Sequence, residues 1–276
     1  MPYLKRAARP TLHYVIDDYT DPWKNAPYIV LQHGNGRSSR FWYSWVPYLS
    51  RFYRVVRPDM RGLGESSAEF DLASEFTLEN CVEDLAAIIE DLGAPSVHVC
   101  GESAGGMVGV ALAALHPERV RTLTLVSTPV HIGAEKRAAY GMSGVTEQTD
   151  RAAYIEATNR SMRFPPTADP GLLEWYTREF QKNRADVQAA MAGLVMQANV
   201  QGYLQRVTVP VLGLYPSEGP ITTPEQKQLL RDHIKNLRLV QLPGTFHKVQ
   251  LMYPAACALH LLHFAAQHDG IACHEP

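Results

Sequence analysis

The chain has 276 residues, of which 46% are hydrophobic and 20% are charged, so it can bury a sizeable core and is not expected to be disordered. Lys and Arg total 26 against 28 Asp and Glu, which leaves a formal net charge of -2. This balance offers no excess of positive charge to hold a polyanion, so nucleic acid is excluded as an expected partner. No apolar run approaches the roughly 18 residues of a membrane helix, and no apolar run follows the basic N-terminal residues, so we expect neither a membrane partner nor secretion.

The four cysteines lie far apart and form no CxxC pair, which indicates neither a disulfide framework nor a zinc ribbon. No HExxH or clustered His/Asp spacing appears, so no metal and no cofactor are expected. Reduced thiols fit a cytoplasmic protein, either a monomer or a homodimer.

Short apolar runs alternate with helical patterns from residue 28 to about residue 127, as in a parallel sheet with crossover helices. Near-continuous β-branched runs predict strands that are buried on both faces. Apolar residues at helical spacing, followed by Gly93 as a stop, predict a crossover helix over 79–92. The expected strands of this half are 28–32, 53–57, 97–100 and 122–126.

The pattern changes after residue 128. No strand-like run occurs over 129–206, where glycines and prolines separate several helical stretches, so this region is predicted to be a helical insertion. Strands return at 209–215 and 237–242, with a helix at 224–234 between them and a last helix from 254 to about 267. The expected units are a core of 1–128 and 207–267, the insertion 129–206, and a flexible tail 268–276.

The sharpest motif is the pentapeptide Gly-Glu-Ser-Ala-Gly at residues 101–105, which directly follows a predicted strand and opens an apolar helix. A serine on a tight strand-to-helix turn sits in strained dihedrals, and small flanking residues let that turn form. This context indicates a nucleophile elbow with Ser103 as the nucleophile.

A serine hydroxyl needs a base to take its proton, and eleven histidines compete for that role. His247 lies just past the strand 237–242, where ligand chemistry is found in open α/β sheets. Most of the others fall in or beside predicted strands and helices or in the tail; His260 and His263, for example, lie inside the final helix. His247 is therefore the predicted base.

Acyl transfer also develops negative charge on an oxygen, which backbone N–H groups must stabilise. The N–H of Ala104 follows the nucleophile, and the N–H of Asn35 lies in the loop after the first central strand, so these two are the predicted oxyanion donors. The alternative for the glycines at 34 and 36 is a dinucleotide fingerprint. It fails because the third glycine would fall on Ser39.

Besides the elbow, residues 57–66 (RPDMRGLGES) and 117–120 (PERV) are similar to two connections of the α/β-hydrolase superfamily. The sequence resembles that family from about residue 27 to 127 and from about 207 to 266. The resemblance implies an α/β fold with an eight-stranded, mostly parallel sheet flanked by helices, and a helical lid inserted after the sixth strand, here 129–206. The segments 33–36 and 128–130 are similar to those of lactonases and enol-lactonases.

In this family the triad acid usually stands directly before a Pro-Ile pair like that at 220–221, and that position here is Gly219. Glu218 lies one residue earlier and keeps the chain order of serine, acid and histidine. The other family location, the end of the sixth strand, holds residues 127–128 and no carboxylate. Glu218 is therefore the predicted acid. The reserve candidates belong to the following helix: Glu225 and Asp232.

A serine nucleophile argues against the dehalogenase and epoxide-hydrolase branches, which by resemblance use a carboxylate. The first hypothesis is a cofactor-free carboxylic ester or lactone hydrolase, in which Ser103 attacks, His247 transfers protons, Glu218 orients His247, and water releases the acyl group. A second is hydrolysis of a carbon–carbon bond in a β-diketone-like compound. A third is a hydrolase-fold ligand receptor or lyase, although a pure binding module would not need nucleophile, base and oxyanion loop together.

The predicted lid is rich in aromatic residues and methionines. Most are expected to pack helices together, but some must face the cleft that the lid covers. We therefore predict a mainly apolar, medium-sized ester or lactone substrate; the alternative is a substrate carboxylate bound by Arg160 or Arg163. The candidate substrate-binding residues are Met142, Phe164, Trp175 and Tyr176.

Overall fold

The computed structural model describes residues 2–133 and 150–273, within which eight strands form one sheet. Their spatial order is β1-β2-β4-β3-β5-β6-β7-β8, with antiparallel pairing of β1 to β2 and of β2 to β4 and parallel pairing elsewhere. This arrangement confirms the eight-stranded, mostly parallel sheet expected of an α/β-hydrolase fold. The strands are β1 (Tyr3–Arg6), β2 (Arg9–Asp17), β3 (Tyr28–Gln32), β4 (Arg54–Pro58), β5 (Val97–Glu102), β6 (Val120–Val126), β7 (Val211–Pro216) and β8 (Leu237–Leu242).

The six strands predicted from apolar runs are all present, with ends that differ by no more than a few residues from the sequence pattern. The strands β1 and β2 have no such run. The strand β1 is the edge of the sheet and has no buried residue, whereas β2, its neighbour, buries Pro10 and Leu12–Tyr14 and leaves its other residues partly buried or exposed. Ala8 makes the tight turn between them with a φ of 52°.

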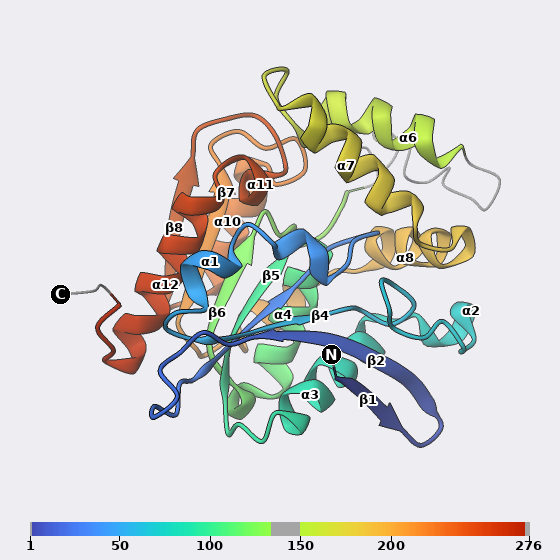
Figure 1. Cartoon of the computed structure of the whole chain (residues 1–276). Coiled ribbons are helices and arrows are strands. Elements are labelled where there is room, and N and C mark those ends of the chain that lie inside the picture. Colours follow the sequence, from blue (N-terminus) through green and yellow to red (C-terminus); the bar gives the residue numbers. More distant parts are fainter. Residues whose placement is uncertain (1, 134–149, 274–276) are drawn as a thin grey trace.

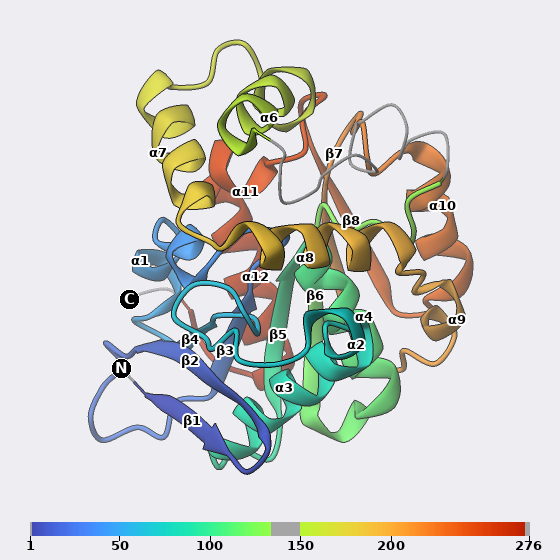
Figure 2. The same ribbon diagram turned by 90° about the vertical axis from the view of Figure 1, so that its right-hand side faces the viewer.

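Helices cover both faces of the sheet (Figures 1 and 2). On one face α4 packs against β5, β6 and α3, and on the other α12 packs against β6, β7 and α1. Each face has its own buried apolar cluster, centred on α3 and α4 in one case and on α1 and α12 in the other. The helices of the core are α1 (Val46–Leu49), α2 (Leu72–Glu75), α3 (Leu78–Asp91), α4 (Ala104–Leu115), α10 (Pro224–His233), α11 (Val249–Met252) and α12 (Pro254–Asp269), with 3-10 turns η1 (Ser39–Trp42) and η2 (Pro117–Arg119).

The described part of the predicted insertion is helical. It comprises α6 (Arg151–Thr158), the π-helical turn η4 (Asn159–Arg163), α7 (Pro170–Gln181), α8 (Ala185–Gln197) and α9 (Gln201–Leu204). The helices α6 and α7 lie together, and α8 runs between them and the core helices α3 and α4 (Figure 2). The apolar residues of α8 join the core cluster of α3 and α4, so this part of the insertion shares the main core.

The last helix extends further than its apolar pattern indicates. α12 continues to Asp269, inside the range predicted to be a tail, because the buried Asp269 carboxylate accepts hydrogen bonds from Arg121 and Tyr53 and also contacts His98. In the part of the chain that the structure describes, no helix combines the length and the apolar character needed to span a membrane.

The parallel pairing of the strands brings the candidate site residues to one edge of the sheet. Since β3, β5, β6, β7 and β8 run in one direction, the loops that follow them meet at one edge of the sheet. The loop after β3 carries residues 33–36, the turn after β5 carries Ser103, and the loop after β8 carries His247. Three segments that are distant in the sequence therefore meet there.

Candidate active site

Ser103 occupies the turn between β5 and α4 with a φ of 53° and a ψ of -117°, outside the regions that ordinary residues adopt. Its backbone N–H donates to the carbonyl of Val126 on the neighbouring strand at 2.9 Å, which fixes the turn. The buried serine thus has the strained conformation of a nucleophile elbow.

The two glycines of the pentapeptide are required by close backbone approach. A Cβ on Gly101 would lie within 3.0 Å of the Gly105 backbone, and a Cβ on Gly105 would lie within 3.0 Å of the carbonyl oxygens of Gln32 and His33. Real Cβ atoms essentially never come that close. Glycine at both positions lets α4 begin directly against the end of β3.

His247 meets this serine from the loop after β8. Its Nε2 lies 3.2 Å from the Oγ of Ser103, and both side chains are buried. The N–H of His247 donates to the carbonyl of Met162 at 2.9 Å, and the N–H of Lys248 donates to that of Arg163 at 3.0 Å. The insertion therefore holds the backbone of the histidine loop in place.

The surroundings of His247 keep its imidazole neutral. Burial lowers the pKa of His247 to about 3. The positive charges of Lys248, Arg163 and Arg37 lower it as well, whereas the carboxylate of Glu102 opposes them. A neutral imidazole is the form that can accept a proton from the Ser103 hydroxyl.

The other imidazole nitrogen of His247, Nδ1, lacks the acceptor that a triad acid would provide. Within the described residues, the Nδ1 of His247 is buried without a hydrogen-bond partner. Glu218, the predicted acid, lies on the loop after β7 with an exposed side chain, and its N–H donates to the carbonyl of Gly244 at 3.1 Å. The structure therefore does not bring Glu218 to His247, because this loop conformation directs residue 218 to solvent.

The loop after β3 is braced by His33. The Nε2 of His33 accepts from the N–H of Met60 at 2.9 Å, so its Nδ1 carries the proton and donates to the carbonyl of Gly34 at 2.9 Å. Burial lowers the pKa of His33, in keeping with this neutral tautomer. The bracing fixes the loop that holds Asn35, while Ala104 is the first residue of α4, where N–H groups lack helical partners.

Three buried charged residues that the sequence analysis did not single out lie beside the serine and the histidine. Lys248 donates to the Oε1 of Glu102 at 2.5 Å, and the same oxygen lies 3.7 Å from the Nε2 of His247. The guanidinium of Arg37 stacks 3.6 Å from the ring centroid of Tyr176. A signal was available, since Glu102 directly precedes Ser103 and Lys248 directly follows His247.

The four predicted substrate-binding residues do not all lie together. Tyr176 is buried and lines a small cavity beside Glu102 and Lys248. Phe164 packs edge-on against Tyr176 with ring centroids 4.9 Å apart. Trp175 is only half-buried; it packs on Phe41 and also lines a separate pocket with Arg40, Tyr43 and Arg57. Met142 lies outside the described residues.

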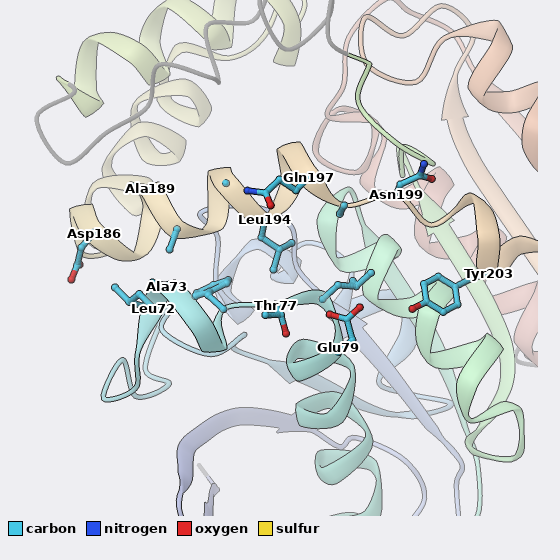
Figure 3. A pocket seen from close by; sticks show the side chains of 15 residues that line it. Leu72, Ala73, Thr77, Glu79, Asp186, Ala189, Leu194, Gln197, Asn199 and Tyr203 are labelled. Atoms are coloured by element: carbon cyan, nitrogen blue, oxygen red, sulfur yellow. The ribbon is translucent and has the colours of Figure 1, made fainter.

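A larger cavity of about 770 Å³ lies elsewhere, between α8 and the start of α3. Figure 3 shows Leu194 and Gln197 of α8 on one side of it and Thr77 and Glu79 on the other. Neither Ser103 nor His247 lines it, so its size does not mark it as the reaction site. Across residues 2–133 and 150–273, no group of three or more His, Cys, Asp or Glu is arranged to hold a metal ion.

Comparisons with known proteins extend over most of the chain. A family model described as "alpha/beta hydrolase fold" matches residues 27–252. A 3-oxoadipate enol-lactonase 2 from Acinetobacter baylyi is 26% identical over 222 residues, which cover 79% of this chain and 81% of that protein. A 2-hydroxymuconate semialdehyde hydrolase from a Pseudomonas species is 26% identical over 260 residues, or 88% of each chain. The crystal structure of an enol-lactonase from Burkholderia xenovorans superposes with a TM-score of 0.83 at 27% identity, covering 96% of this chain and all of that one.

Proposed function

Because the chain belongs to the α/β-hydrolase family, we propose that it is a serine hydrolase that cleaves a carboxylic ester or lactone through an acyl-enzyme on Ser103. The observation that carries the proposal is the 3.2 Å contact between Ser103 Oγ and His247 Nε2 on a strained elbow. The similarity to the two enol-lactonases described above supports the same bond type.

In the first half-reaction the neutral His247 accepts the Ser103 proton as the oxygen attacks the carbonyl carbon. The N–H groups of Ala104 and Asn35 are the proposed donors to the oxyanion. His247 then gives its proton to the leaving oxygen, and the ester or lactone bond breaks. In the second half-reaction His247 activates water, which releases the acid and restores Ser103.

The base works in this proposal without a carboxylate at its Nδ1. The negative charge that supports the imidazolium comes instead from Glu102, whose Oε1 lies 3.7 Å from Nε2. This carboxylate remains ionised although burial opposes it, because the charge and the hydrogen bond of Lys248 lower the pKa of Glu102. The catalytic residues are thus a Ser103–His247 dyad, with Glu102 as a positioning residue.

We also propose that the described helices of the insertion act as a lid. Tyr176 of α7 closes the small cavity beside Glu102, so the substrate enters when this helix moves. The lid also supplies the carbonyls of Met162 and Arg163 that hold the His247 loop.

The experiment is a substrate panel on the wild-type protein and Ser103→Ala. Ester and lactone hydrolysis that disappears in the variant supports the proposal. The second candidate is hydrolysis of a carbon–carbon bond, favoured by the similarity to 2-hydroxymuconate semialdehyde hydrolase. Faster turnover of a ring-opened diketone than of any ester or lactone would select that reaction instead.

A further inference from the structure

A buried ion pair lies beside the base of the dyad, and its positive member has no role in the steps above. The Nζ of Lys248 lies 2.5 Å from the Oε1 of Glu102, and the two side chains are only 5% and 3% exposed. The same oxygen lies 3.7 Å from the Nε2 of His247. One carboxylate oxygen therefore faces both an ammonium group and the imidazole nitrogen that must take a proton from Ser103.

Backbone contacts hold both members of this pair in place. The other carboxylate oxygen of Glu102, Oε2, packs against the loop after β3, where a Cβ on Gly34 would lie within 3.0 Å of it. The N–H of Lys248 donates to the carbonyl of Arg163 at 3.0 Å, and its own carbonyl accepts from the N–H of Leu251 at 3.1 Å. The carboxylate therefore has little room to turn away from the imidazole.

Stability alone does not account for the Glu102–Lys248 pair. The cost of taking two charges out of water offsets their attraction, and apolar residues of similar volume often serve a buried position as well or better. This pair stands at two particular places in the sequence, since Glu102 directly precedes Ser103 and Lys248 directly follows His247. Its charges therefore act where the proton transfers take place.

An unpaired carboxylate at this position would interfere with the base. Opposite charges attract strongly in a buried site, so a bare Glu102 at 3.7 Å would favour the protonated form of His247. An imidazolium cannot accept the Ser103 proton. A proton held on Nε2 by the carboxylate would also be harder to pass to the leaving oxygen. The ammonium of Lys248 competes with the imidazole for the same oxygen and so weakens this attraction.

We propose that Lys248 is a positioning residue for the base: by pairing with Glu102, it keeps His247 a free base before attack and lets its proton pass on afterwards. The inference rests on the proposed function, since it assigns a further residue to the same reaction. In each half-reaction one proton moves to Nε2 from Ser103 or from water. It then leaves for the departing oxygen or for Ser103, while Glu102 and Lys248 keep their own charges.

Four charged groups influence the imidazole, from the loop after β3, the end of β5, η4 and the residue before α11: Arg37, Glu102, Arg163 and Lys248. Among these, Lys248 has the largest effect on the pKa of His247. The guanidinium groups of Arg37 and Arg163 donate to a backbone carbonyl and to a threonine hydroxyl, whereas Lys248 donates to the carboxylate itself. From α7, the ring of Tyr176 faces Arg37 and Lys248. Lys248 is therefore the cation placed to neutralise Glu102.

The kinetic test follows kcat/KM for p-nitrophenyl acetate between pH 5 and pH 8 in two variants that change the pair in opposite directions. Lys248→Met leaves the carboxylate unpaired, so the imidazole binds a proton more readily and activity should fall as the pH falls. An imidazolium pKa of about 7 or above makes kcat/KM about tenfold lower at pH 6 than at pH 8. Glu102→Gln removes the anion, so its profile should stay constant although kcat decreases. Lys248→Arg keeps the charge and should also give a constant profile.

A double variant separates an electrostatic role from a structural one. With neither charge present, Lys248→Met/Glu102→Gln should again show a constant profile over this range. The matched control is Lys227→Met, because Lys227 is another buried lysine, whose Nζ donates to the carbonyls of Pro216 and Ser217. This change should lower the midpoint of urea unfolding but leave the pH profile constant.

NMR titration of the His247 imidazole tests the same idea without turnover. Its nitrogen chemical shifts should be constant from pH 5 to pH 8 in the wild-type protein and should titrate in Lys248→Met. If Lys248→Met does not fold, Lys248→Gln keeps a donor for Glu102 without the charge and should titrate in the same way. If no ester or lactone shows Ser103-dependent turnover but the imidazole titrates as expected, the proposed function fails and the role of Lys248 stands.

Two results would overturn the proposal. One is an imidazole that stays neutral down to pH 5 in a folded Lys248→Met or Lys248→Gln protein. The other is an acidic decline in kcat/KM that persists in the double variant or occurs equally in Lys227→Met, since the loss would then come from altered packing and not from the charge on Glu102.

Discussion

Gly105 provides a test that connects the fold to the chemistry. In Gly105→Ala the new methyl group would lie within 3.0 Å of the carbonyl oxygens of Gln32 and His33. Both atoms belong to the backbone at the end of β3, so no flexible side chain can move away. Either α4 or the loop that holds Asn35 must shift, and overpacking of this kind costs about 1–3 kcal/mol.

Two measurements on Gly105→Ala check this reasoning. Urea unfolding should show the loss of stability as a lower midpoint at an unchanged slope. Because the displaced loop carries a proposed oxyanion donor, kcat for p-nitrophenyl acetate should also fall, towards the roughly 10²–10³-fold loss typical of a missing donor. Gly193→Ala is the control, since Gly193 lies in α8 with no atom within 4 Å of a new Cβ. It should gain about 0.5–1 kcal/mol and keep its kcat. Wild-type stability and kcat in Gly105→Ala would refute the close approach as the reason for glycine.

Three further predictions concern the base, the acid and the lid. Since the pKa of His247 is lowered to about 3, its imidazole stays neutral as the pH falls towards 5. We therefore expect kcat/KM for a neutral ester to be constant between about pH 5 and pH 8, and a tenfold decline centred near pH 6.5 would contradict this. Glu218→Gln should change kcat by less than about threefold, because Glu218 is exposed and does not contact His247; a hundredfold loss in a folded variant would show that it moves to the imidazole during turnover. Shortening residues 134–200 removes the carbonyls of Met162 and Arg163 that hold the His247 loop, and the core contacts of α8. It should therefore abolish hydrolysis and lower the midpoint of urea unfolding. Retained turnover with an altered substrate preference would show that the His247 loop folds without these contacts.

The strands and the elbow could be predicted because their signals are local. The strand β3 begins with a continuous apolar run, only His98 interrupts the one that begins β5, and the pentapeptide around Ser103 is a short motif with its own steric requirement. The strand β2 could not be named in the same way. Polar residues interrupt its apolar ones, so its nine residues form neither a continuous apolar run nor a strict alternation.

The surroundings of the dyad depend on long-range contacts that no local pattern encodes. The small cavity beside Glu102 and Lys248 is formed by the loop after β3, the elbow, α7 and the start of α11, and only the fold brings these segments together. Glu218 illustrates the opposite case. It stands in nearly the right place along the chain, but a one-residue offset on a loop decides whether a side chain faces the imidazole or solvent.

The central proposal is that Ser103 is the nucleophile of an acyl-enzyme. Its most direct test is mass spectrometry of the wild-type protein after reaction with a serine-directed fluorophosphonate, alongside hydrolysis rates for wild type and Ser103→Ala. We expect a single adduct on the peptide containing Ser103, and a Ser103→Ala protein that folds but hydrolyses esters at least about a thousandfold more slowly. An adduct on another residue, or near-wild-type hydrolysis by a folded Ser103→Ala protein, would contradict the proposal.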